Sequence, residues 1–135
     1  MKFSDLKEGM KASFTKSFTD EDVKAFARIS GDVNPIHIDD DAAAASIFGK
    51  RVVHGILVTG LISAVLGNRL PGQGTIYLGQ DSSFMAPVFL GDEITAEVEV
   101  FELRPDKKIA KLSTTCTNRS GKQVLKGTAV VKLAE

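Results

Sequence analysis

The chain has 135 residues, with 17 basic and 17 acidic side chains, so its formal net charge is zero. This length suits one domain with a single core, and we expect residues 1–135 to form that domain. A neutral chain creates no long-range field toward polyanions, which argues against nucleic acid or an anionic membrane as a partner.

The single cysteine, Cys116, excludes an internal disulfide and cannot by itself form a thiolate zinc site. The first residues mix charges and lack the uninterrupted apolar segment of a signal peptide. The longest apolar run, "VVHGILVTGLISAVLG" at residues 52–67, is interrupted by polar residues and is shorter than the roughly 20 residues that span a membrane. We therefore expect a cytoplasmic protein without a membrane segment.

The first half of the chain predicts one short strand and three helices. Residues 11–18 alternate polar and apolar side chains, which is typical of a strand. Thr19 followed by three acids predicts the start of a helix, and Gly31 predicts its end. Residues 39–48 begin with aspartates and continue with alanines, which indicates a second helix. Residues 55–69 are apolar nearly all the way round, as expected of a helix at the centre of the fold.

The second half of the chain changes from helical to alternating periodicity. Apolar side chains occupy every second position of residues 93–101 and 109–117, which predicts half-buried antiparallel strands. Turn-forming residues separate these strands from a last strand at 123–133, and an earlier strand covers 74–85. A very apolar helix and several amphipathic strands predict an α+β fold in which an antiparallel sheet wraps around the helix.

The segment "GDVNPIH" at residues 31–37 contains a first candidate for catalysis. Asp32 and His37 would point apart on a continuous helix or strand, so they converge only if the chain bends between them. Pro35 forces Asn34 away from helical geometry, and Asn34 tolerates turns, so the sequence supplies the bend. A carboxylate and an imidazole that share one water form an acid/base site. The alternative is that Asp32 caps the following helix and His37 is a hydrogen-bonded core histidine.

The start of the predicted central helix is a second candidate. Its first N–H groups have no helical partner and the helix dipole favours negative charge, so the Gly55 N–H is placed to stabilise an oxyanion. The alternative is that Gly55 only allows close packing against the sheet. Helical spacing directs Ser63 toward the catalytic loop and Leu66 toward an apolar pocket, unless Ser63 bonds to the carbonyl four residues before it. His54 receives no catalytic role.

Three segments resemble the MaoC-like, (R)-specific enoyl-CoA hydratases. "FARISGDVNPIHIDDDAAAASIF" at residues 26–48 is similar to their hydratase motif, in which an aromatic residue precedes Gly-Asp-x-Asn-Pro-(aliphatic)-His. "VVHGILVTGLIS" and "FMAPVFLGDEITAEVEV" look like the family's central helix and its Phe-x-x-Pro-(x)3-Gly-Asp segment. The resemblance implies a hotdog fold and a homodimer whose two sheets join edge to edge.

The resemblance also implies a reaction and the roles of single residues. The reaction would be reversible hydration of a trans-2-enoyl-CoA to the (R)-3-hydroxyacyl-CoA, without a metal or an organic cofactor. Asp32 and His37 would hold and activate the water, and the Gly55 N–H would polarise the thioester carbonyl. Asn34 and Ser63 would orient the catalytic pair. The pathway served would be polyhydroxyalkanoate synthesis from fatty-acid oxidation.

Two further sets of residues are assigned to substrate binding. The acyl pocket is expected to be formed by Ser63, Leu66 and Val131. The candidates for contacts with the CoA phosphates, chosen by charge alone, are Lys50, Arg51, Lys107 and Lys108.

Other functions remain open from the sequence. Hotdog thioesterases commonly carry a catalytic carboxylate on or beside the central helix, but residues 55–70 contain no Asp or Glu. A 3-hydroxyacyl-carrier-protein dehydratase would use the same chemistry on another carrier. A non-catalytic acyl-thioester-binding module would be expected to lack Asp32 or His37, and both are present.

Overall fold

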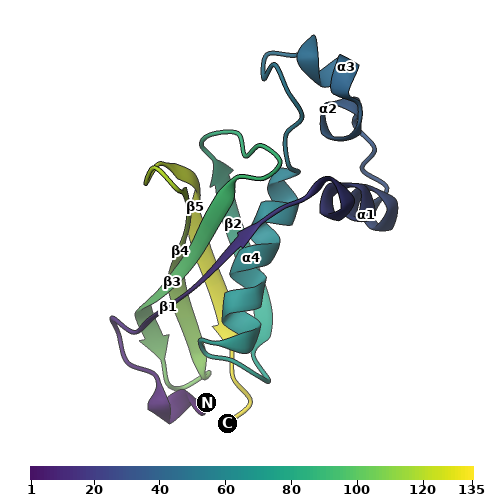
Figure 1. Cartoon of the computed structure of the whole chain (residues 1–135). Coiled ribbons are helices and arrows are strands. Elements are labelled where there is room, and N and C mark those ends of the chain that lie inside the picture. Colours follow the sequence, from purple (N-terminus) through teal and green to yellow (C-terminus); the bar gives the residue numbers. More distant parts are fainter.

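The computed structural model describes all residues of the chain, 1–135. Its helical elements, shown in Figure 1, are a short 3-10 turn η1 (Phe3–Asp5) and the helices α1 (Asp20–Ser30), α2 (Pro35–Ile38), α3 (Asp40–Ala44) and α4 (Gly55–Asn68). Its strands are β1 (Lys11–Ser17), β2 (Ile76–Phe84), β3 (Glu93–Arg104), β4 (Ile109–Asn118) and β5 (Gln123–Lys132).

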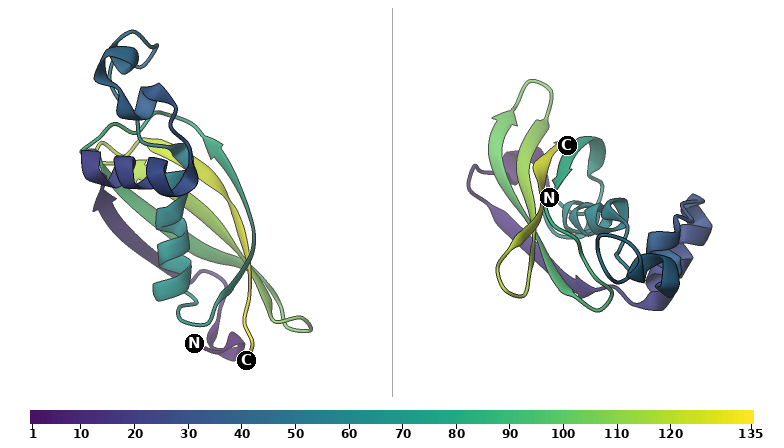
Figure 2. Two further views of the ribbon diagram at one scale, coloured as in Figure 1. Left: turned by 90° about the vertical axis from the view of Figure 1, so that its right-hand side faces the viewer. Right: turned by 90° about the horizontal axis from the view of Figure 1, so that it is seen from above.

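The strands form one five-stranded sheet in the order β1-β3-β4-β5-β2, with every neighbouring pair antiparallel. Strands β1 and β2 are therefore the two edges. Helix α4 lies along one face of the curved sheet and contacts β1, β2, β3 and β4 (Figures 1 and 2). This is the predicted hotdog fold, an antiparallel sheet around a central helix.

The core lies between α4 and the sheet. In β3 the buried positions alternate with more exposed ones, so that Ile94, Ala96 and Val98 are fully buried. Ile62 and Val65 of α4 are also fully buried, in the same apolar cluster. Burying each large aliphatic side chain contributes about 1.5–3 kcal/mol to folding, so this layer fixes the position of α4 on the sheet.

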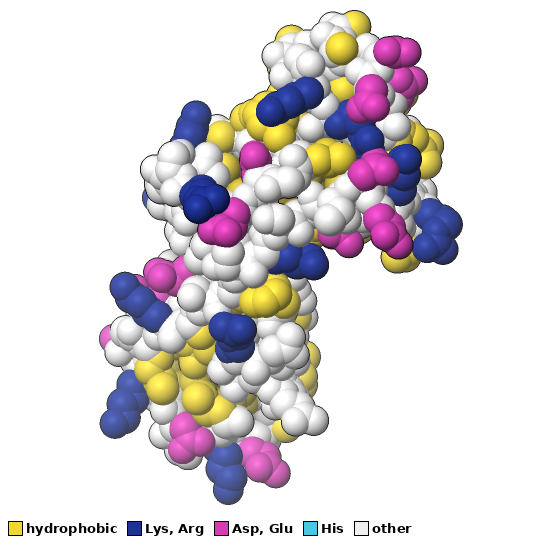
Figure 3. All heavy atoms as spheres, viewed as in Figure 1, with side chains coloured by type: hydrophobic (Ala, Val, Ile, Leu, Met, Phe, Trp, Pro, Cys, Tyr) yellow, Lys and Arg dark blue, Asp and Glu magenta, His cyan; other side chains and the backbone are white.

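Helices α1, α2 and α3 form an overhang, residues 20–51, that projects beyond the sheet at the N-terminal end of α4 (Figure 1). After the overhang, Val52 forms an isolated antiparallel bridge with Phe89, which lies between β2 and β3. Basic and acidic side chains are interspersed over this face of the molecule, consistent with its neutral net charge (Figure 3). No helix is both long and apolar enough to cross a membrane.

Two local predictions differ from the structure. The second predicted helix, 39–48, ends at Ala44, and residues Pro35–Ile38 form a separate short helix where only a bend was expected. Proline disfavours helical geometry in the residue before it but fits the first helical position, because its missing N–H would be unpaired there in any case. Pro35 therefore keeps Asn34 outside helical geometry and itself begins helix α2.

Candidate active site

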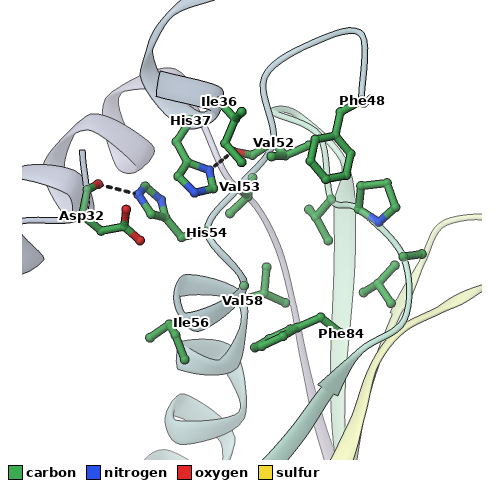
Figure 4. Close-up of a pocket in the computed structure, with 15 residues that line it drawn as sticks. Asp32, Ile36, His37, Phe48, Val52, Val53, His54, Ile56, Val58 and Phe84 are labelled. Atoms are coloured by element: carbon green, nitrogen blue, oxygen red, sulfur yellow. Dashed lines mark hydrogen bonds between the residues drawn. The ribbon is translucent and has the colours of Figure 1, made fainter. Parts of the chain in front are cut away.

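A pocket of about 290 Å³ opens where the overhang meets the N-terminus of α4. Fifteen residues line it and 10 of them are hydrophobic. Its polar end is formed by Asp32, His37 and His54 (Figure 4). Gly55 also lines the pocket. The apolar part includes Val58, Phe84, Ala86 and Val124. A mostly apolar cavity with a few convergent polar groups is the common form of a small-molecule site.

The turn between α1 and α2 places Asp32 at this pocket. Gly31 ends α1 with a φ of 82°, a left-handed conformation that glycine adopts without strain. The Asp32 carboxylate then accepts the N–H of Asn34 at 3.3 Å, and the Asn34 side chain accepts the N–H of Ile36 at 3.4 Å. Asn34 is thus the N-cap of α2, and its main chain helps to orient the Asp32 carboxylate.

Helix α2 carries His37 into the wall of the pocket, where its ring is 8% exposed. Its Nδ1 lies 2.7 Å from the main-chain oxygen of Val52, which can only accept a hydrogen bond. In the neutral ring, Nδ1 therefore carries the hydrogen and Nε2 is the free acceptor. Burial lowers the pKa of His37, assisted by His54, while the hydrogen bond to Val52 and the charge of Asp32 act in the opposite direction.

The predicted convergence of Asp32 and His37 is present in the structure. The Asp32 carboxylate and the ring nitrogens of His37 and His54 lie within 4.8 Å of one another. One water molecule can bridge acceptors at this separation, because each of its hydrogen bonds spans about 2.8 Å. Asp32 itself is exposed at the pocket mouth, so its carboxylate remains hydrated.

His54, which was predicted to have no catalytic role, is part of the same cluster and is only 2% exposed. Its Nε2 lies 3.0 Å from the main-chain oxygen of Asp32. Its ring stacks on that of His37, with centroids 3.8 Å apart and planes at 25°. Its position in the sequence could have indicated a functional role, because a histidine is unusual inside an apolar run and this one directly precedes the candidate oxyanion donor Gly55.

Gly55 is the first residue of α4, as predicted, so its N–H has no partner within the helix. A side chain at this position would lie 2.8 to 3.0 Å from ring atoms of Phe84, closer than real contacts allow. The close-packing interpretation of Gly55 is therefore correct in part. Gly55 is also one of the residues that line the pocket.

The residues predicted for the acyl pocket lie elsewhere in this single chain. Leu66 and Val131 are 1% and 0% exposed in the core, Ser63 is exposed on α4, and none of the three lines the pocket. The reason is distance, since Ser63 follows Gly55 by about 12 Å along the helix axis. Thr59, rather than Ser63, bonds to the carbonyl four residues before it, at 3.2 Å from the Gly55 oxygen.

The four cations considered for the CoA phosphates have different surroundings. Arg51 is committed to the overhang, because its Nε donates to the His37 main-chain oxygen at 2.7 Å and its Nη1 lies 2.6 Å from Asp20 Oδ1. Lys107 and Lys108 lie in the β3–β4 turn, next to the C-terminal segment and at the far end of the sheet from Gly55 (Figure 1). Only Lys50 remains near the pocket, exposed above the Phe89 ring.

The cluster of Asp32, His37 and His54 offers ligand types that bind transition metals, but its geometry does not suit one. Ligands of a tetrahedral zinc ion lie about 3.3 Å apart, given metal–ligand bonds of about 2.0 Å, whereas these atoms are separated by up to 4.8 Å. The arrangement suits a bridging water better.

Comparisons with known proteins identify the family of the chain. A family model described as "MaoC like domain" matches residues 2–122. The (R)-specific enoyl-CoA hydratase of Aeromonas caviae is 50% identical over 133 residues, which covers 98% of this chain and 99% of that protein. The enzyme of the same name from Rhodospirillum rubrum is 48% identical, over 96% of this chain and 89% of that protein.

A solved structure gives the same result. The (R)-hydratase from A. caviae, described as involved in PHA biosynthesis, superposes with a TM-score of 0.92 at 51% identity, covering 95% of this chain and 97% of that one. The family model, the two relatives and the solved structure lead to one conclusion. The chain belongs to the MaoC-like domain family.

Proposed function

We propose that this protein is an (R)-specific enoyl-CoA hydratase, which adds water reversibly to a trans-2-enoyl-CoA to form the (R)-3-hydroxyacyl-CoA. One observation carries the proposal. The Asp32 carboxylate and the His37 imidazole meet in an apolar pocket whose wall also contains the N-terminus of α4. The relatives named above support the substrate and the stereochemistry.

Asp32 and His37 are proposed to hold the attacking water between them. The free Nε2 of His37 accepts one hydrogen of the water, and the Asp32 carboxylate accepts the other. As one proton passes to this pair, the oxygen forms a bond to C3 and the π electrons move toward the thioester oxygen. The pair then returns a proton to C2, so that one water has been added and both side chains are restored.

The Gly55 N–H is proposed to stabilise the negative charge on the thioester oxygen. It is the first donor of α4, and the dipole of this 14-residue helix favours negative charge at that end. A single donor of this kind typically contributes about 10²- to 10³-fold to kcat. The acid/base pair and the oxyanion donor thus act on opposite ends of the conjugated system.

The apolar part of the pocket is proposed to bind the acyl chain. Val58, Ala86 and Val124 would contact its first carbons. Ser63, Leu66 and Val131 stay the proposed contacts for longer acyl chains, beyond the part of the pocket that the single chain lines. Lys50 is the proposed contact for a CoA phosphate, and Asn34 the proposed orienting residue for Asp32.

The protein is also proposed to be a homodimer joined at β2, with the substrate channel near the interface. Strand β2 is an edge of the sheet and exposes three consecutive apolar side chains, Ile76, Tyr77 and Leu78. The opposite edge, β1, carries Lys11 and Lys16. An apolar edge is prone to pairing and a charged one resists it, so β2 is the edge that suits a partner. We place the enzyme in the cytoplasm, supplying monomers from fatty-acid oxidation for polyhydroxyalkanoate synthesis.

The direct test is to follow the absorbance of the enoyl thioester with crotonyl-CoA and octenoyl-CoA. We expect loss of absorbance with at least one substrate, and chiral analysis should identify the (R)-3-hydroxyacyl product. If the absorbance of both substrates stays unchanged, the hydratase proposal is refuted. An (S) product would refute the proposed stereochemistry. The same acyl group on an acyl carrier protein, assayed in parallel, identifies the preferred carrier.

A further inference from the structure

His54 connects three parts of the site that come from separate segments of the chain. Its Nε2 bonds to the main chain of Asp32, and its ring stacks on His37. Phe26 of α1 packs edge-on against the His54 ring, at a centroid distance of 4.8 Å. His54 is also the N-cap residue of α4, so its own main chain leads directly into Gly55.

The one hydrogen bond of the His54 ring defines which of its nitrogens carries the hydrogen. The Asp32 main-chain oxygen can only accept, so in the neutral ring Nε2 carries the hydrogen. Nδ1 is buried and makes no hydrogen bond within the chain. Burying a polar atom without a partner is unfavourable, and an apolar ring of the same size would avoid the cost. What an apolar ring would not provide is the bond to Asp32.

We propose that His54 is a positioning residue, which holds the main chain of Asp32 and the ring face of His37 in register with the Gly55 N–H. This inference rests on the proposed hydratase function. The bond at 3.0 Å fixes the turn that carries the Asp32 carboxylate, and the stack prevents the His37 ring from rotating about its bond to Val52. A shift of about 1 Å in either catalytic group can cost up to 10²-fold in rate.

Two substitutions separate the bond from the packing. In His54→Gln the amide nitrogen reaches the position of Nε2 and keeps the donor to Asp32, whereas His54→Phe keeps a ring but has no donor. We expect His54→Phe to lower kcat by about 10- to 100-fold with KM changed by less than about threefold. His54→Gln should recover most of that loss. Equal losses in the two variants, or a greater loss in His54→Gln, would overturn the proposal.

A control and a double variant exclude a general loss of stability. Val65→Ala removes a fully buried side chain of α4 that does not line the pocket, so it should lower thermal stability and leave kcat unchanged below the melting transition. If His54 acts through Asp32, adding His54→Phe to Asp32→Asn should cost little beyond Asp32→Asn alone. Fully additive losses would contradict the inference.

Histidine nitrogen NMR tests the inference even if the protein hydrates no substrate. The chain has two histidines, so the spectrum of His54→Gln contains His37 alone and assigns both residues. In the wild type we expect the proton of neutral His54 on Nε2. Because His54 lowers the pKa of His37, the titration midpoint of His37 should rise in His54→Gln. A proton on Nδ1 of His54 would remove the donor to the Asp32 main-chain oxygen and would refute the positioning role independently of activity.

Discussion

The Nδ1 atom of His37 lies 2.7 Å from the main-chain oxygen of Val52, so the segment before α4 fixes the direction of a side chain that belongs to α2. This bond leaves Nε2 as the only ring nitrogen available to a water. Burial lowers the pKa of the ring below its ordinary value of 6.5, because the charged form is poorly solvated there. His37 is therefore neutral, and ready to accept a proton, at neutral pH.

The hydration rate should be retained as the pH falls through 6.5 and should decline only below the lowered pKa of His37. The reason is that the neutral ring is the form that accepts a proton from water. A profile of kcat/KM against pH for crotonyl-CoA measures this limb in the free enzyme. An acid limb centred above 6.5 would contradict the assignment of His37 as a buried base.

The free energy of unfolding should respond to the same ring. The unfolded chain takes up a proton on His37 near pH 6.5, whereas the folded chain does so only at lower pH. Between these two values the unfolded state binds more protons, so the stability contribution of His37 is lost as the pH falls through that window and is constant above it. Urea unfolding from pH 5 to 8 of the wild type and of His37→Gln, which lacks this group, measures the difference.

Gly55→Ala should lower kcat/KM by about 10- to 100-fold. The new methyl group would approach Phe84 to 2.8–3.0 Å, and the ring, which is 53% exposed, would tilt into the pocket or away from it. In a Phe84→Ala background the same substitution should cost much less. Gly60→Ala is the matched control on the same helix, because a methyl group there meets nothing within 4 Å, and it should preserve activity.

Arg51→Met should lower the free energy of unfolding by about 1.5–3 kcal/mol, the range for a hydrogen bond from a charged donor. Only 10% of the Arg51 side chain is exposed, and its bond to the His37 main-chain oxygen joins α2 to the segment before α4. Urea titration tests the effect. The control is Lys24→Met, since Lys24 pairs with the same Asp20 but is 59% exposed, and it should leave the unfolding midpoint unchanged.

Leu78→Lys should convert the proposed dimer into a monomer of 14.5 kDa, measured by sedimentation equilibrium. Leu78 is 51% exposed on the edge strand β2, where a charge opposes pairing. Phe101→Lys is the matched control, because Phe101 is 45% exposed on β3, which already has a neighbour on each side. If only Phe101→Lys dissociates the dimer, the interface lies elsewhere. If the wild type sediments as a monomer, the proposed dimer does not form.

Local sequence patterns predicted those helices and strands whose conformation depends mainly on residues nearby in the sequence. Alternation in 109–117 predicted β4, found at Ile109–Asn118, and the all-round apolar run from residue 55 predicted α4. The Gly31 helix end and the bend at Asn34 and Pro35 also follow from local sterics, which is why the convergence of Asp32 with His37 was predictable.

Contacts between distant segments were not predictable in the same way. Two examples are the ion pair of Arg51 with Asp20 and the hydrogen bond of His54 with Asp32. Both depend on how the overhang folds back onto α4, which no periodicity in the sequence predicts. The prediction of the acyl-pocket residues also depended on a distance in the folded chain, that between Ser63 and the pocket. Helical spacing gave the direction of Ser63 relative to Gly55 but not its separation from the pocket.

The most direct test of the central claim is the rate of crotonyl-CoA hydration by Asp32→Asn and His37→Gln. We predict that kcat falls by about 10²- to 10⁴-fold in each variant, because each removes one of the two groups that hold and activate the water. Circular dichroism should remain like that of the wild type. Glu97→Gln, which removes an exposed carboxylate of β3, should retain full activity. Wild-type rates in both Asp32→Asn and His37→Gln would contradict the catalytic assignment even if the hydratase activity itself is present.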